Sequence, residues 1–319
     1  MKILVTGGAG FIGSHLCEAL LKSGQNVLAL DDLSTGNKEN ISNLTSNPRF
    51  TFVNGSILDP EIVERMVDQS DSVMHFAAAV GVQKILKDPI GSLRTNLEGS
   101  ENVLKAAARL NKPTILASTS EIYGKNNADS LSEDSDRILG SPLRSRWTYS
   151  EAKAIDESLA RALFEESGWK VKIGRLFNTV GPRQSSAYGM VIPRFFTAAL
   201  KGEPLEVHGD GTQRRVFCHI DDAISGILSL WSNEGGAGEA FNVGGFEETT
   251  ILDLAKRIVS LTSSKSEIKM VPYEKLSASG FEDMQRRVPN TTKLRNLTGW
   301  TATKNLETIL VDTLKEMRS

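Results

Sequence analysis

Short apolar runs alternate with segments of helical periodicity over the first part of the chain. Each run ends at glycine or at polar residues, which is typical of strands buried inside a parallel sheet. The predicted strands are Lys2–Thr6, Asn26–Leu30, Phe50–Asn54, Ser72–Phe76, Thr114–Ala117 and Val171–Leu176. Between them, apolar residues recur at helical spacing over Phe11–Lys22, Leu97–Ala108 and Thr148–Glu166. This alternation predicts an α/β fold with a doubly wound parallel sheet.

The pattern changes after about Val180, where Gly181, Pro182 and Pro193 interrupt it. Helical periodicity returns at 221–231 and 251–262. We therefore expect two parts, a sheet domain at 1–180 and a smaller C-terminal lobe at 181–319. Because parallel sheets bind ligands at the carboxyl ends of their strands, we expect the lobe to hold a substrate above that edge.

A glycine-rich loop follows the first predicted strand and opens the first predicted helix. Gly7, Gly10 and Gly13 are three residues apart, so the backbone can approach a pyrophosphate closely and the helix N-terminus can bind it. The second strand ends at Asp31, 18 residues past Gly13, with Asp32 beside it. A carboxylate there accepts hydrogen bonds from a ribose diol and repels a 2′-phosphate. The sequence thus predicts a Rossmann-type domain that binds NAD rather than NADP, with Phe11 and Ile12 also at the cofactor.

Tyr149 and Lys153 lie one helical turn apart on one face of a predicted helix. A free tyrosine has a pKa of about 10, too high for a base at neutral pH. A nearby ammonium and a cationic nicotinamide favour the phenolate, so we expect Lys153 to lower the pKa of Tyr149. Tyr149 would then take a proton from a sugar hydroxyl as hydride leaves its carbon, and Lys153 would also hold the nicotinamide ribose.

Several motifs together resemble the extended short-chain dehydrogenases. They are TGGAGFIGSHL, HFAAA at 75–79, STSEIYG at 118–124, YSEAK at 149–153, RLFNTVGPR at 175–183 and GDGTQRRVFCHIDD at 209–222. This family includes UDP-hexose 4-epimerases, nucleotide-sugar 4,6-dehydratases and UDP-glucuronate decarboxylases. The resemblance implies tightly held NAD, a nucleotide-sugar substrate, usually UDP-linked, oxidised to a 4-keto sugar, and a homodimer built through a helix bundle.

The resemblance also implies roles for individual residues. It places Thr119 at the reacting 4′-hydroxyl, Ala77 at the cofactor, and Asn178, Arg215 and Arg287 at the diphosphate or the nearby sugar. Arginine suits that task because its fork matches phosphate oxygens. One departure is Ser56, where the family usually carries an aspartate near the adenine.

The residues after Thr119 bear on the reaction that follows oxidation. Glu121 counts among the candidate catalytic residues, and Ser120 is a poor acid for expelling a C6 hydroxyl, which ranks a dehydratase third. The Ser118–Gly124 motif resembles the decarboxylases, and Arg146 resembles an arginine of that branch, so Arg146 and Ser120 are the expected partners of a substrate carboxylate. Ile85 stands where the decarboxylases carry a tyrosine, which keeps a 4-epimerase open. A catalytically inactive NAD sensor is a further alternative.

Charge and cysteine content exclude other classes. The chain of 319 residues carries 37 basic and 39 acidic residues, a net charge of −2, so nothing in its charge favours nucleic acid or an anionic membrane as partner. Two cysteines and four scattered histidines lack metal-ligand spacing, so we expect reduced thiols and no metal site. No signal peptide or membrane span is evident, and we expect a cytoplasmic protein.

Overall fold

The computed structural model describes residues 1–81, 88–186, 189–273 and 284–318. Ile85, on which one argument for an epimerase depends, lies outside these residues. None of the helices in the described ranges is long and apolar enough to cross a membrane.

The core of the protein is a seven-stranded parallel sheet with the order β11-β6-β5-β4-β1-β2-β3. Its strands are β1 (Lys2–Thr6), β2 (Asn26–Asp31), β3 (Phe50–Asn54), β4 (Ser72–His75), β5 (Thr114–Thr119), β6 (Val171–Leu176) and β11 (Ala240–Val243). The chain runs outward from β1 through β2 to β3, then returns to β4 on the other side of β1. This order confirms the predicted doubly wound, Rossmann-type fold, in which ligands bind where the direction of winding reverses.

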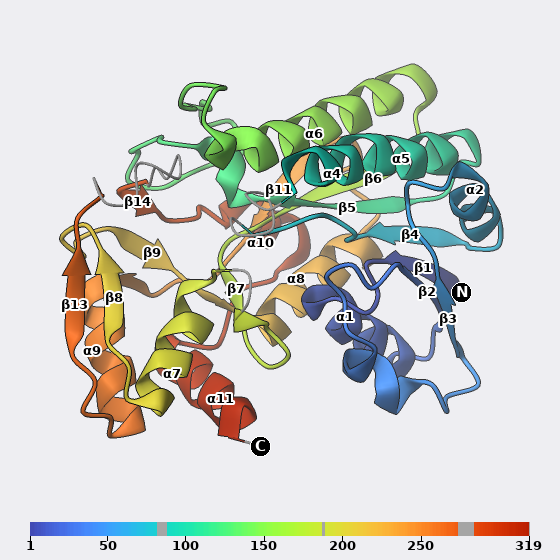
Figure 1. Ribbon diagram of the computed structural model, residues 1–319. Coiled ribbons are helices and arrows are strands. Elements are labelled where there is room, and N and C mark those ends of the chain that lie inside the picture. The colour runs from blue at the N-terminus through green and yellow to red at the C-terminus, as the bar shows by residue number, and fades with distance from the viewer. Residues whose placement is uncertain (82–87, 187–188, 274–283, 319) are drawn as a thin grey trace.

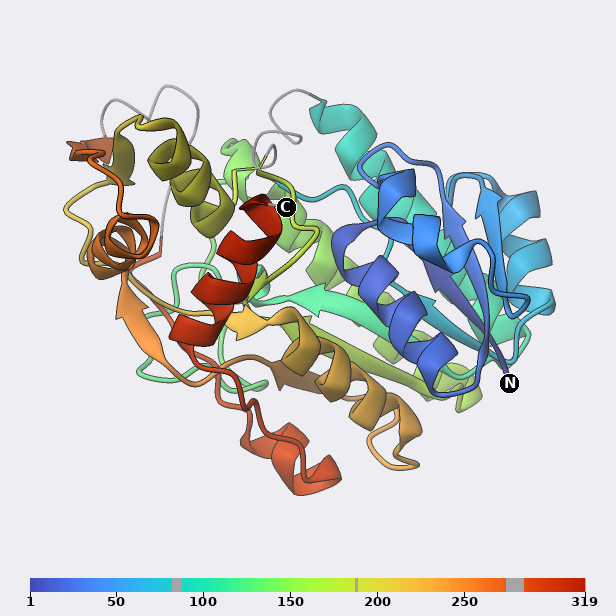
Figure 2. The ribbon, with the colours of Figure 1, turned by 90° about the horizontal axis from the view of Figure 1, so that it is seen from below.

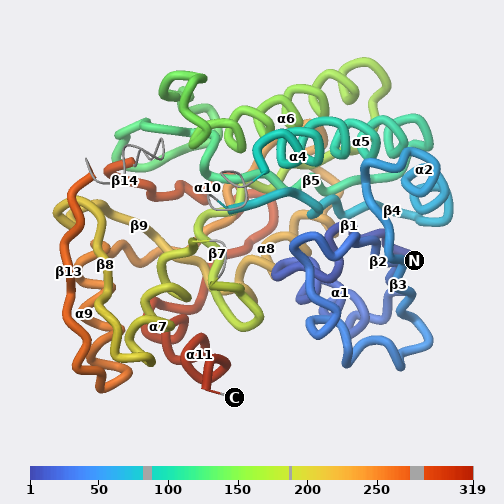
Figure 3. The backbone as a smooth tube through the Cα atoms, viewed as in Figure 1, coloured from blue at the N-terminus to red at the C-terminus, as the bar shows by residue number. Residues whose placement is uncertain are grey.

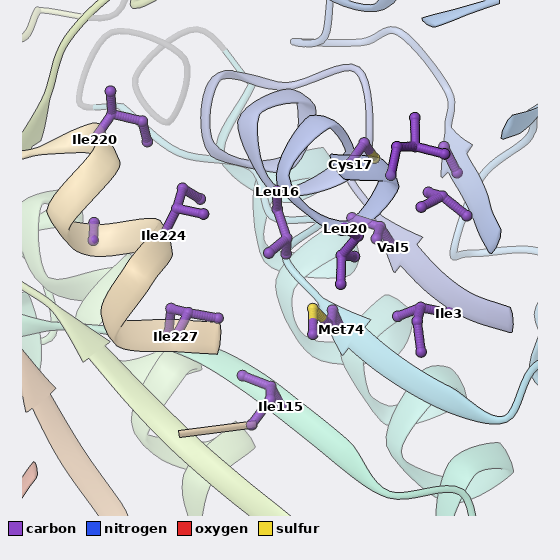
Figure 4. Close-up of a cluster of buried hydrophobic side chains, with 14 of the residues drawn as sticks. Ile3, Val5, Leu16, Cys17, Leu20, Met74, Ile115, Ile220, Ile224 and Ile227 are labelled. Carbon is purple, nitrogen blue, oxygen red and sulfur yellow. The ribbon is translucent and has the colours of Figure 1, made fainter. Parts of the chain in front are cut away.

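Helices cover both faces of the sheet because successive strand residues point to opposite faces. One face packs against α1 (Phe11–Lys22) and α8 (Ile220–Ser232), which lie side by side in Figure 2. The other face packs against α2 (Pro60–Asp68), α5 (Ser100–Arg109) and α6 (Thr148–Ser167), with α4 (Pro89–Arg94) beside α6. Figure 4 shows Leu16 of α1 facing Ile224 of α8 in the first of these two cores, to which Val5 of β1 also belongs.

The second part of the chain forms a smaller layer around its own apolar core, to the left of the sheet in Figures 1 and 3. Its helices are α7 (Val191–Lys201), α9 (Ile251–Thr262) and α11 (Leu306–Arg318), whereas α10 (Thr292–Thr298) packs against α8 and β11 of the sheet domain. Its strands pair as β8 (Leu205–His208) with β13 (Ile268–Val271), β7 (Thr179–Val180) with β10 (Cys218–His219), and β9 (Arg214–Val216) with β12 (Glu248–Thr250) and β14 (Arg286–Arg287).

The chain crosses back to the sheet after residue 180. α8 packs on the sheet beside α1, and β11 forms the edge strand next to β6, pairing Ala240 with Ile173. Residues from both sides of position 180 therefore contribute to the sheet domain. The division into 1–180 and 181–319 stays a prediction.

Candidate active site

One large cavity lies above the carboxyl ends of the strands and has a volume of about 910 Å³. Residues of the sheet domain and of the smaller layer line it together. The expected site residues among its lining are Gly7, Gly10, Phe11, Ile12, Gly13, Asp31, Asp32, Ala77, Thr119, Ser120, Glu121, Arg146, Tyr149, Asn178 and Arg287. Lys153 and Arg215 are buried but do not belong to this lining. The structure therefore brings together nearly all residues that the sequence singled out.

The glycine loop forms the floor of one end of the cavity. Gly7 has a φ of +72°, and a Cβ atom there would press on the backbone of Ala77. A Cβ atom on Gly13 would overlap the carbonyl oxygen of Gly7. The N-terminus of α1 has no side-chain cap and no acidic residue in its first turn, so its N–H groups remain available to an anion. These residues fit a dinucleotide pyrophosphate.

The two aspartates at the end of β2 take different partners. Asp31 is 8% exposed and accepts hydrogen bonds from the N–H groups of Ala9 (3.0 Å) and Leu33 (2.8 Å). Burial raises the pKa of its carboxyl group. Asp32 instead accepts a hydrogen bond from the hydroxyl of Ser56 at 3.2 Å. Ser56, the departure noted above, thus holds Asp32, while Asp31 is fixed by the backbone at the cavity.

Glu121 is the centre of a buried ion cluster at the other end of the cavity. Its carboxylate contacts Nη2 of Arg146 at 2.6 Å and Nη1 of Arg287 at 2.7 Å. Arg287 also donates to Oγ of Ser120 (3.3 Å) and to Oδ1 of Asn178 (3.4 Å). Burial opposes ionisation, but the two guanidinium charges outweigh it and lower the pKa of Glu121 to about 2. Glu121 is therefore ionised at neutral pH.

Tyr149 hydrogen-bonds with Thr119, and both residues line the cavity. The pKa of Tyr149 is raised, first by burial and then by the negative charges of Glu121 and Asp156. We expected Lys153 to lower the pKa of Tyr149. The surrounding residues raise that pKa instead, so the expectation is wrong. Burial is the first cause, and Nζ of Lys153 pairs with Oδ2 of Asp156 at 2.9 Å.

The two arginines that the resemblance places at the diphosphate or the nearby sugar take different positions. Arg287 lines the cavity and contacts Glu121. Arg215, on β9, donates from Nη1 to the carbonyl oxygen of Arg214 at 2.8 Å and lies outside the cavity lining. Asn178 lines the cavity but donates its amide to the carbonyl oxygen of Val216 at 2.7 Å, with a positive φ of 38°.

Sequence reasoning missed the buried carboxylates on α6. Asp156 follows Lys153 by three residues, a spacing that places both on one helix face. Glu157 accepts a hydrogen bond from Ser118 at 2.5 Å and pairs with Nη2 of Arg175 at 2.7 Å. The Lys153–Asp156 spacing was a usable signal, whereas the partners of Glu157 come from β5 and β6 and could not be read from spacing.

The fold and the cavity define a Rossmann-type enzyme that binds a dinucleotide beside a tyrosine–lysine pair. The family model for the NAD dependent epimerase/dehydratase family matches residues 3–244. The chain belongs to this family and uses NAD.

Similar proteins include nucleotide-sugar decarboxylases and a 4-epimerase. A UDP-N-acetyl-alpha-D-glucosaminuronate decarboxylase of Bacillus cytotoxicus is 39% identical over 99% of this chain and 98% of its own length. UDP-glucuronic acid decarboxylase 1 of Danio rerio is 35% identical over 98% of this chain and 72% of its own length. Among solved structures, UDP-glucuronic acid 4-epimerase of Bacillus cereus has a TM-score of 0.90 at 30% identity, covering 100% of this chain and 99% of its own.

Replacing Asp31 with asparagine should weaken NAD binding by about 10-fold and strengthen NADP binding. The amide keeps the size of the side chain but removes the charge that is expected to bind the ribose diol and repel a 2′-phosphate. Calorimetric titration of both cofactors measures the two dissociation constants. Asp32→Asn is the matched comparison and should have the smaller effect, since Asp32 faces Ser56. Unchanged preference in Asp31→Asn would contradict the assignment.

Proposed function

We propose that this enzyme decarboxylates a UDP-linked hexuronic acid, UDP-glucuronate in the first place, through a 4-keto sugar. The observation that carries this proposal is the buried cluster of Glu121, Arg146 and Arg287. One negative and two positive charges leave the cluster at +1. A substrate carboxylate buried in this cavity needs a cation, because an unpaired buried charge is costly. The curated relatives named above support the same class of substrate.

The chain's own residues would divide the work as follows. Thr119 would hydrogen-bond the reacting 4-hydroxyl and Tyr149 would take its proton, while NAD held by the glycine loop and Asp31 would supply the hydride acceptor for C4. The resulting β-keto acid loses CO2 when the C5–C6 electron pair moves toward the C4 carbonyl. The enolate would then take one proton at C5, and Tyr149 would return its proton to the C4 oxygen as the ketone is reduced again. The balance is one carboxylate and one proton consumed, with one CO2 released.

A 4-epimerase is the second candidate, because it uses the same oxidation and the same carboxylate-binding cluster. The likeness to UDP-glucuronic acid 4-epimerase of Bacillus cereus favours keeping it. The two reactions differ after the 4-keto sugar has formed: the decarboxylase breaks the C5–C6 bond, whereas the epimerase returns hydride to the other face of C4. A 4,6-dehydratase ranks third, since Ser120 stands where a general acid would be needed. An NAD sensor would bind the cofactor and never reduce it.

Product analysis in deuterated water tests the proposal. We expect UDP-glucuronate or UDP-N-acetylglucosaminuronate to yield CO2 and a UDP-pentose that carries one deuterium at C5, because C5 takes its new proton from solvent. Mass spectrometry and NMR identify the product and the position of the label. A 4-epimer of the starting sugar with no CO2 and no label at C5 would establish the epimerase instead.

Glu121→Gln should strengthen substrate binding and slow turnover. Removing the negative charge leaves both arginines to the substrate carboxylate, so KM for the hexuronate should fall about 5- to 10-fold, or about 1 kcal/mol. Turnover should fall about 100-fold, because Glu121 no longer opposes the carboxylate in the ground state. Steady-state kinetics of CO2 release measures both constants.

Arg146→Ala is the matched variant of opposite sign and should raise KM for the hexuronate. Binding of neutral UDP-glucose, measured by calorimetry, should change little in either variant. A similar loss of affinity for charged and neutral sugars would show that the cluster serves structure rather than the carboxylate.

We also propose a cytoplasmic homodimer joined through α4 and α6. These helices lie beside each other and expose Ile90 (74%) and Ile155 (55%). Apolar side chains that stand out on adjacent helices suit a partner's helices. Both cysteines are free and buried, which fits a reducing compartment.

Ile155→Glu should convert the dimer to a monomer, because a charge would enter an apolar interface. Sedimentation velocity at micromolar concentration measures the change. Val311→Glu on α11, where Val311 is 44% exposed, is the control and should stay dimeric. A wild-type protein that sediments as a monomer contradicts this proposal.

A further inference from the structure

Lys153 is held by a carboxylate that is as deeply buried as the lysine itself. Its Nζ lies 2.9 Å from Oδ2 of Asp156, and each side chain is 2% exposed. Ser100, at the start of α5, also hydrogen-bonds with Asp156. A buried carboxylate is costly unless it is paired and hydrogen-bonded, and Asp156 meets both conditions.

A chain of buried hydrogen bonds continues from Ser100 to the loop after β4. Nε2 of His75 lies 3.1 Å from Oγ of Ser100, and Nδ1 of His75 lies 2.7 Å from Oγ1 of Thr6. The Thr6 hydroxyl oxygen in turn accepts the N–H groups of Phe76 and Ala77, each at 3.2 Å. Phe76 and Ala77 line the cavity.

The direction of this chain follows from its donors and acceptors. The Thr6 oxygen uses both lone pairs for backbone N–H groups, so its hydrogen points to Nδ1 of His75. Burial lowers the pKa of His75 to about 3, with the charge of Lys153 acting the same way, so the ring is neutral. The proton of His75 is then on Nε2 and points to Ser100, whose own hydrogen points to Asp156. Every donor in the chain is oriented toward the Asp156 carboxylate.

We propose that Asp156, fixed by the chain Thr6–His75–Ser100, is a positioning residue that holds Lys153 and sets the pH range in which Tyr149 works as a base. This inference rests on the proposed roles of Tyr149 and Lys153. It adds a carboxylate to the tyrosine–lysine pair and connects that pair to the cofactor side of the cavity through Ala77.

The charges around Tyr149 give the sign of the effect. Lys153, Asp156 and Glu157 lie on its own helix, with Arg175 of β6 paired to Glu157. Glu121 faces Tyr149 from the turn after β5, and carries Arg146 and Arg287 with it. His75 of β4 is neutral. Asp156 therefore neutralises the ammonium of Lys153, one helical turn from Tyr149, and opposes the phenolate, so removing its charge should let Tyr149 ionise at lower pH.

The test is the pH dependence of sugar oxidation in Asp156→Asn. In a single turnover with UDP-glucuronate and with UDP-glucose, NADH formation is followed by its absorbance. We expect the midpoint of the acid limb to fall by about one pH unit relative to the wild type. Asp156→Glu keeps the charge and should restore the wild-type midpoint. An unchanged midpoint in Asp156→Asn overturns the inference, whatever happens to the plateau rate.

Two further variants separate positioning from stability. Asp222 is a buried aspartate outside the cavity lining that accepts hydrogen bonds from Thr303 and Lys304. Asp222→Asn should lower the Tm without moving the midpoint. If Asp156→Asn does not fold, Ser100→Ala removes one donor to Asp156 and should shift the midpoint in the same direction by a smaller amount; no shift there contradicts the inference.

Failure of the proposed function gives a different result. If no CO2 is released but NAD is reduced by a nucleotide sugar, the decarboxylase proposal fails. The midpoint of the acid limb for sugar oxidation still tests the role of Asp156. If no sugar reduces NAD, the ultraviolet difference spectrum of the tyrosinate tests the inference about Asp156. Each NAD-bound protein is compared with its Tyr149→Phe counterpart across pH, and identical spectra for wild type and Asp156→Asn overturn the inference.

Discussion

The site depends on the cost of burying carboxylates where parallel strands end. Three of them, Glu121, Asp156 and Glu157, lie under or beside the cavity, and each is paired with cations. Leaving any one unpaired would cost several kcal/mol, roughly the scale of a domain's whole stability. The cations come from different elements, so pairing fixes α6, β5, β6 and β14 against one another. The same pairs that hold the fold together thus determine the charge around the reacting atoms.

The cluster at Glu121 also joins the two parts of the chain. Arg146 precedes α6, Glu121 follows β5, and Arg287 comes from β14 of the smaller layer. The substrate end of the cavity is therefore complete only when the smaller layer is docked on the sheet. The cofactor end needs no such docking, because Gly7, Gly13 and Asp31 all lie next to β1 and β2.

Local patterns predicted the elements and the cofactor end well, because a glycine loop and a strand-end aspartate act within one βαβ unit. β5 extends past the predicted Ala117 to Thr119, since polar Ser118 and Thr119 continue the ladder with β6. The position of Arg287 and the partners of Glu157 depend on long-range packing, which spacing does not encode. The direction of the Tyr149 pKa was mistaken for a related reason: burial and the charges of Glu121 and Asp156 raise it, and none of these follows from the Tyr149–Lys153 spacing.

The charge balance at the cavity connects binding of the substrate carboxylate with stabilisation of the enolate in the proposed reaction. In the proposed reaction, a hexuronate carboxylate of −1 would meet the cluster at +1, so the sugar end of the cavity would be nearly neutral. When neutral CO2 departs, the negative charge would move to the enolate oxygen at C4, near Thr119 and Tyr149, while the cluster would keep its positive charge nearby. The buried Lys153–Asp156 pair adds no net charge at that moment. The cluster and the hydroxyls of Thr119 and Tyr149 would then stabilise the enolate. These groups are held in place before the reaction begins.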